Sequence, residues 1–91
     1  MATISVTPQS GSRYHVTIDE AHSATTHVVT VWPSDVDRYA SGATPEELIE
    51  ASFEFLLSRE PKESILREFE LPVIERYFPD YSSEMRSRFG G

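Results

Sequence analysis

A strongly apolar segment with a clear helix start, residues 44–79, constrains this chain more than any other feature, because it holds most of the large apolar side chains. Thr44, Pro45 and Glu47 supply a capping hydroxyl, a proline at the first helical position and a glutamate three residues after the cap. When residues 47–58 are placed on a helix, their apolar side chains cover roughly 200° of its circumference. A surface helix needs only about 100° of apolar face, so we expect cover from two sides, by a sheet and by a further helix or a second copy of the chain.

Length and composition favour a single small domain over residues 1–91. This length suits one hydrophobic core, and the absence of cysteine excludes disulfides and thiolate zinc sites. No apolar run approaches the roughly 20 residues that span a bilayer, and the N-terminus lacks the pattern of a signal peptide. We therefore expect a cytoplasmic protein with no membrane partner. Residues 1–12 are interpreted as either a short edge strand or a flexible lead, and residues 80–91 as either a short helix or a flexible tail.

The charge distribution disfavours nucleic acid as a partner. The formal net charge is −7, and the half from residue 45 onwards carries most of it. A general nucleic-acid binder presents a basic face to the phosphates, whereas the only basic cluster here is the pair Arg86 and Arg88. The acidity indicates either a solvated face that keeps the protein soluble or a surface for a basic partner.

Two segments have the alternation of β-strands. Residues 13–19 place Tyr14, Val16 and Ile18 on one face, and residues 26–32 are rich in β-branched side chains. The polar residues 20–25 between them predict a hairpin in which Val16 faces Val29, so that the apolar side chains gather under the helix.

Prolines divide the remainder of the chain. Pro33 is expected to end the second strand, with residues 34–43 crossing to the long helix as a loop that contains at most one helical turn. Pro61 is expected to open a second helix that reaches Phe69, and Pro72 a third that Pro79 stops. The predicted fold class is therefore α+β: an antiparallel hairpin of two or three strands packed on one long amphipathic helix, followed by two or three short proline-delimited helices.

No pattern of reactive side chains predicts an enzyme. His15, His22 and His27 lack metal-binding spacing, and the hairpin places His15 and His27 on opposite faces. Asp35 and Asp37 have the spacing of ordinary loop aspartates that face water. No motif sets a serine beside a base. We expect no catalytic residue, no cofactor and no metal site.

An apolar and aromatic surface is the better functional prediction. The aromatic cluster around Phe78 fits either core packing or an interface, because aromatic side chains that stay partly exposed carry binding energy well. Together with the wide apolar face of the long helix, it predicts a non-enzymatic protein-interaction or regulatory module, with a protein partner or a homodimer. The residues expected at the interface are Phe53, Phe55, Leu56, Tyr77, Phe78 and Tyr81.

Residues 63–78, ESILREFELPVIERYF, also have the outline of a helix-turn-helix, with two short helices around a tight break. The second of these helices would expose only Glu75 and Arg76 as charged residues, which provides too little positive charge for binding in a DNA groove. Nucleic-acid reading is therefore not predicted.

Three resemblances extend these predictions. Residues 45–81, which include FEFLLSREPKESILREFELPVIERYFPDY, resemble a family of short uncharacterised bacterial proteins, which implies no mechanism. Residues 14–57 are similar to HicB-type antitoxins, which implies binding of a small toxin. The resemblance lies in YHVTI, in VVTVWPSD, and then in Gly42, Thr44, Pro45, Glu46, Glu47 and Leu48. The final Gly90 and Gly91 resemble the ends of ubiquitin-like and sulfur-carrier proteins, which implies a tail that is adenylated at its carboxylate.

Overall fold

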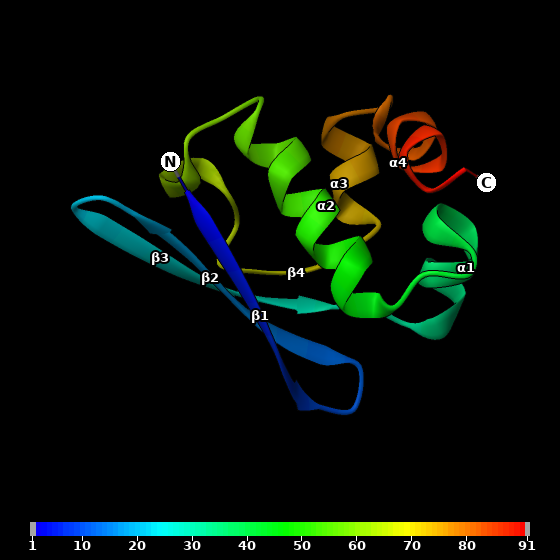
Figure 1. Cartoon of the computed structure of the whole chain (residues 1–91), viewed down its shortest axis with the longest axis horizontal. Helices are drawn as coiled ribbons and strands as arrows, with labels where there is room; N and C mark the ends of the chain where they lie inside the picture. The colour runs from blue at the N-terminus through cyan, green and yellow to red at the C-terminus, as the bar shows by residue number, and fades with distance from the viewer. Residues whose placement is uncertain (1, 91) are drawn as a thin grey trace.

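The chain folds into two layers, a four-stranded mixed sheet and a layer of four helices that covers one face of it (Figure 1). This computed structural model describes residues 2–90. The arrangement confirms the α+β class. In chain order the elements are β1 (Thr3–Ser10), β2 (Arg13–Glu20), β3 (Ser23–Thr30), α1 (Pro33–Ala40), α2 (Pro45–Leu57), a 3-10 turn (Lys62–Ser64), β4 (Glu68–Glu70), α3 (Val73–Tyr77) and α4 (Tyr81–Phe89).

Helix α2 begins at the predicted signal. The Thr44 hydroxyl accepts a hydrogen bond from the Glu47 backbone N–H at 3.1 Å, and the Glu47 carboxylate accepts one from the Thr44 N–H at 2.9 Å. This reciprocal pair satisfies two helix N–H groups that have no carbonyl partner within the helix. The sheet, α1 and α4 all pack against α2, so its wide apolar face is covered from more than one side within a single chain.

The three antiparallel strands β1, β2 and β3 form a meander, with a hairpin register that differs from the predicted one. Val16 lies opposite His27 and not Val29. The prediction was wrong because β2 and β3 extend to Glu20 and Ser23, which leaves a turn of two residues where a longer connection was expected. Since a shift of two positions preserves side-chain direction, the same apolar side chains still face the helices. Residues 3–10, one of whose two interpretations was an edge strand, form β1.

Two further segments differ from the sequence prediction. Residues 33–40 form the helix α1 where a loop was expected, because Pro33 occupies its first turn and the Asp35 carboxylate accepts a hydrogen bond from the Trp32 backbone N–H at 2.9 Å. The helix predicted from Pro61 to Phe69 is also wrong. That segment is one 3-10 turn followed by β4, which pairs parallel to β3.

The last two helices lie where the proline and glycine positions indicated. Helix α3 follows Pro72 directly, and α4 ends at Gly90, whose φ of 71° is the left-handed geometry that glycine adopts without strain. The residue at the N-cap position of α4 is Asp80, where a serine at 82 or 83 was predicted. The tail residues 81–89 are therefore helical, and Gly91 lies outside the described residues.

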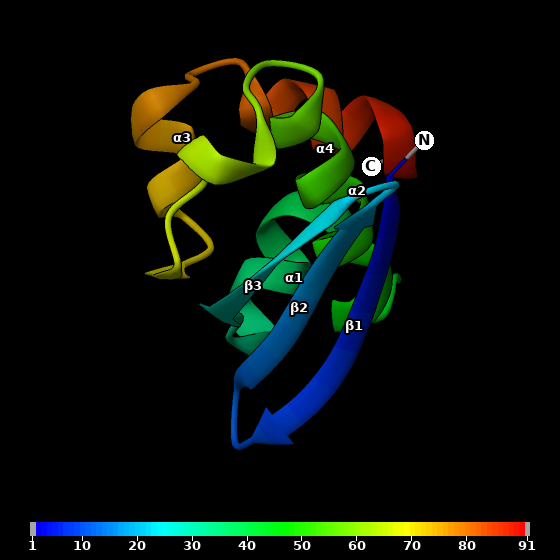
Figure 2. The same ribbon diagram turned by 90° about the vertical axis from the view of Figure 1, so that its left-hand side faces the viewer.

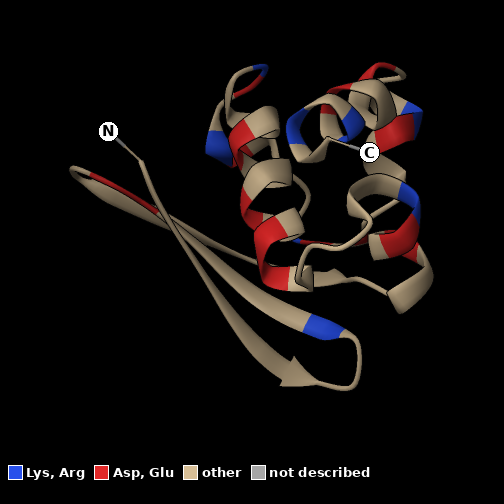
Figure 3. Ribbon diagram, turned by 45° about the vertical axis from the view of Figure 1, so that its right-hand side comes forward, with Lys and Arg blue, Asp and Glu red and all other residues tan. Residues whose placement is uncertain are grey.

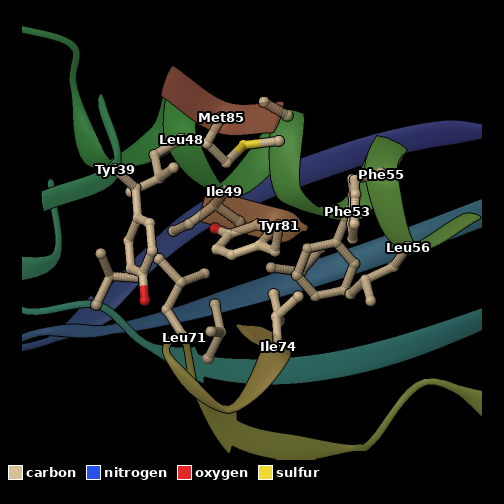
Figure 4. Close-up of a cluster of buried hydrophobic side chains, with 14 of the residues drawn as sticks. Tyr39, Leu48, Ile49, Phe53, Phe55, Leu56, Leu71, Ile74, Tyr81 and Met85 are labelled. Atoms are coloured by element: carbon tan, nitrogen blue, oxygen red, sulfur yellow. The ribbon is translucent and has the colours of Figure 1, made fainter. Parts of the chain in front are cut away.

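Tyr81 lies at the centre of the helical layer (Figure 4). Its hydroxyl is 2.6 Å from the Ser52 hydroxyl, which donates onward to the Leu48 carbonyl at 2.7 Å. Its ring packs 5.0 Å from that of Tyr39 and 5.4 Å from that of Phe55. Because both hydroxyls of this buried pair are satisfied, α2 and α4 meet in a closed, well-packed core.

Candidate functional site

An apolar groove opens between the C-terminal end of α2, the segment before β4, β4 itself and α3. Figure 2 shows how these elements are arranged. Its volume is about 310 Å³, near the lower end of the range of about 300–1,000 Å³ that ligand pockets cover. Such a space accommodates a few side chains more readily than a large cofactor. The residues that line it are Leu56, Glu60, Ser64, Ile65, Leu66, Phe69, Val73, Ile74, Tyr77 and Phe78.

Two large apolar side chains stay exposed beside this groove. Leu66 is 46% exposed and Tyr77 is 67% exposed, whereas the deeper lining residues Phe69 and Ile74 are buried. A third exposed apolar side chain, Trp32, lies before α1 and does not line the groove. The groove thus combines a closed apolar floor with exposed apolar walls, which is the arrangement that favours desolvation by a partner.

The buried His27 holds one wall of the groove in place. Its Nδ1 donates a hydrogen bond to the Leu66 carbonyl at 2.8 Å, since a carbonyl can only accept, and its Nε2 lies 2.9 Å from the Thr25 hydroxyl. Burial lowers the pKa of His27, the hydrogen bond to Leu66 opposes this, and the Arg67 charge lowers the pKa further. A neutral imidazole therefore fixes the backbone from which the Leu66 side chain projects.

Lys62 fixes the start of the segment that runs from the 3-10 turn to β4. Its ammonium lies 2.8 Å from the Glu20 carboxylate and 2.7 Å from that of Glu63, although the lysine side chain is only 4% exposed. The hydrogen bond to Glu20, followed by that to Glu63, raises the pKa of Lys62, so the ion pairs outweigh burial. The 3-10 turn is thereby tied to the end of the hairpin.

Helix α3, the opposite wall, is fixed by side chains from α1. The Glu75 carboxylate accepts hydrogen bonds from the Tyr39 hydroxyl at 2.7 Å and from Arg38 at 3.1 Å. Burial, followed by the Glu75 hydrogen bond, raises the pKa of Tyr39, so the phenol remains a proton donor. The Arg59 guanidinium lies 5.7 Å from the ring centre of Phe78 and forms an ion pair with Asp80, the residue just before α4. Both walls are thus held by contacts outside the groove itself, which leaves the groove preformed.

Acidic side chains surround this apolar surface. Glu60 lines the groove, Glu68 and Glu70 lie exposed on β4, and Glu75 lies on α3. Glu68 is paired with Arg13 across the sheet at 2.8 Å. Glu75 is likewise paired, with Arg38 at 3.1 Å. Figure 3 shows acidic positions on the helices throughout the upper layer. The rim of the groove is therefore polar, with carboxylates on β4 and α3.

The structure brings together three of the six side chains predicted for an interface. Leu56, Tyr77 and Phe78 line the groove. Phe53, Phe55 and Tyr81 lie in the core, with at most 7% of each exposed.

The wall residue Leu66 and the floor residue Phe69 were missed, because their segment was interpreted as helical. The alternation Glu-Phe-Glu-Leu over residues 68–71 was the signal that could have found this strand.

Helix α2 does not need a second copy of the chain to cover its wide apolar face. One sheet was expected to be too little cover, and α1 and α4 supply the rest. Self-association stays a prediction, now one that depends on the exposed Leu66 and Tyr77.

His15 and His27 project from opposite faces of the sheet, as predicted, because His15 pairs with Val28 while His27 pairs with the buried Val16. Within residues 2–90 no group of three or more histidine, aspartate or glutamate side chains could hold a metal ion. No helix in that same range is long and apolar enough to cross a membrane.

Comparison with protein-family models, curated proteins and solved structures finds no match to this chain.

Proposed function

We propose that this chain is a non-enzymatic protein-interaction or regulatory module, acting in the cytoplasm, that binds a protein partner through the apolar groove. The observation that carries the proposal is the exposure of Leu66 and Tyr77 beside the same preformed, mostly apolar groove. Exposed apolar side chains scattered singly need no explanation, whereas a contiguous group around a concave surface marks an interaction site. The acidic side chains around it form the polar rim.

The test is comparative enrichment from a lysate of the organism that encodes the chain. The baits are the wild-type chain and the variants Leu66→Ser, Tyr77→Ser and Trp32→Ser. The last is the matched control, because it removes an exposed large apolar side chain outside the groove. We expect a protein that wild type and Trp32→Ser retain and that both groove variants lose. Equal retention by all four baits, or retention by none under several conditions, would contradict the proposal.

A HicB-type antitoxin is a special case of this function. The structure has the β2–β3 hairpin followed by a helix capped at Thr44, which favours the alternative, although α1 intervenes between hairpin and helix. This alternative predicts a small toxin encoded beside the gene and a complex of the two purified proteins. A neighbouring gene of another kind, or two proteins that do not associate, would remove it.

Self-association through the groove is a further form of the proposal. It predicts that the mass in solution rises from the monomer towards the dimer with concentration and that Tyr77→Ser abolishes the rise. Sedimentation equilibrium at high micromolar concentration measures this directly, and a monomeric mass there would exclude the homodimer.

A further inference from the structure

The groove runs beside an open edge of the sheet. The strand order is β1, β2, β3, β4, so β4 is a terminal strand. Its backbone pairs with β3 at alternate residues: the Val28 N–H donates to the Arg67 carbonyl at 2.7 Å, and the Leu71 N–H donates to the Thr30 carbonyl at 3.0 Å. Because a strand directs successive backbone groups to opposite sides, those of residues 68 and 70 point away from β3, towards the open edge.

The side chains of β4 divide in the same way between two surfaces. Phe69 points into the helical layer and forms part of the groove, while Glu68 and Glu70 are exposed on the other face of the sheet. In Figure 2 the yellow segment that contains β4 lies at the left-hand margin of the molecule, below α3. A further strand placed along β4 would direct every second side chain into the groove and the intervening ones towards the two glutamates.

We propose that the groove binds an extended peptide segment that adds to β4 as a fifth strand, with apolar residues alternating with lysine or arginine. This inference rests on the proposed function and specifies its partner. The apolar residues of the segment occupy the space between Leu66, Phe69 and Tyr77. Its basic residues face Glu70 and also Glu68, which already pairs with Arg13 at 2.8 Å, and its backbone pairs with the outward groups of β4.

The opposite edge of the sheet is less suited to this role. Strand β1 carries Pro8, which has no N–H to offer a partner, and small polar side chains such as Thr7 and Ser5. None of the large exposed apolar side chains belongs to β1. A hollow beside β1 is lined by Ile4 and Leu57 together with Glu50 and Glu54, but it has no large exposed apolar side chain. The exposed Leu66 and Tyr77 therefore favour β4.

The test uses a short synthetic peptide in which valine and lysine alternate, titrated into the 15N-labelled intact chain. We expect chemical-shift changes at the amides of residues 66–70 and slower hydrogen exchange at residues 68 and 70. Three control peptides share its length: one with glutamate for lysine, one with the same composition in blocks, and one N-methylated at the residues that would pair with β4. Each should bind at least about tenfold more weakly, because it loses the charge match, the alternation or the main-chain pairing.

The outcomes separate this inference from the proposed function. Equal affinity of the N-methylated peptide, stronger binding of a helical peptide of similar charge, chemical-shift changes confined to residues 3–10, or no binding at millimolar peptide each overturn strand addition at β4. The proposed function then still stands if the enrichment experiment gives a partner that Tyr77→Ser loses. As a protein-side control, Tyr77→Ser should weaken the alternating peptide at least about tenfold, and Trp32→Ser should leave its affinity unchanged.

Discussion

The hydrogen bond between Ser52 and Tyr81 provides a sharp test of the core. Ser52 donates to the Leu48 carbonyl, so the Tyr81 hydroxyl is the donor in the 2.6 Å contact between the two hydroxyls. Ser52→Ala leaves that buried donor without an acceptor, at a cost of about 1–3 kcal/mol. The better helix propensity of alanine offsets about 0.5 kcal/mol of this cost. Tyr81→Phe leaves no donor unpaired and should cost only about 0.5–1.5 kcal/mol.

The two substitutions should therefore not be additive. In the Tyr81→Phe background there is no phenolic O–H that could lose its acceptor, so adding Ser52→Ala should change the free energy of unfolding little further. The expected coupling is about 0.5–2.5 kcal/mol, because the net cost of the serine substitution nearly disappears in the double variant. Urea unfolding followed by circular dichroism measures it: with a slope of about 1 kcal/mol per M, 1 kcal/mol moves the midpoint by about 1 M.

The matched control is Ser87→Ala, an exposed serine in α4 that reports helix propensity alone. A Ser52→Ala cost that is the same in the wild-type and Tyr81→Phe backgrounds would refute the assignment of donor and acceptor. If neither Ser52→Ala nor Tyr81→Phe cost more than the control, the hydrogen bond between the two hydroxyls would not contribute to stability.

Three further predictions concern His27 and Lys62, which hold the groove in place, and Tyr77, which is exposed beside it. Folding lowers the pKa of His27 from 6.5, so the unfolded chain binds more protons than the folded one below that pH. The contribution of His27 to the free energy of unfolding should be constant above about pH 7. It should fall as pH drops through 6.5, with a slope of at most about 1.4 kcal/mol per pH unit. Urea unfolding between pH 7 and 5 should show this slope in wild type and in the control His22→Gln but not in His27→Gln. Lys62→Met should speed hydrogen exchange over residues 58–67, whereas the exposed control Arg86→Met should not, and equal exchange in both would contradict the anchoring role. Tyr77→Ser should change the free energy of unfolding by only about 0.5 kcal/mol, because the side chain is 67% exposed, and a loss of several kcal/mol would show that it is structural.

Local signals in the sequence were sufficient for part of the fold. The Thr44 cap, the alternation around Val16 and the stop at Gly90 each act over a few residues, and α2, β2 and the end of α4 lie where these signals indicated. Proline was harder to interpret, because Pro33 both follows the last strand residues and opens a helix. A proline can follow the end of a strand or occupy the first turn of a helix, and Pro33 occupies the first turn of α1.

The segment that builds the groove could not be predicted from local pattern alone. Ile65 and Phe69 are four residues apart, which is helical spacing, yet each is buried from an extended or turn-like backbone. What decides the conformation of this segment is pairing with β3, which is remote in sequence. Leu56, Tyr77 and Phe78 were found because their size and aromatic character are local properties, whereas Leu66 was missed because its exposure depends on the fold.

The parallel pairing of β3 with β4 has a consequence for when the groove can form during synthesis. Two antiparallel neighbours can meet as soon as both have been made, but β4 reaches β3 only after α1 and α2 have been formed between them. The groove also needs Tyr77 and Phe78, which are made later still. During synthesis, therefore, a chain with a complete hairpin and a complete α2 still has no groove, and under the proposed function a partner would bind only a chain whose folding has finished.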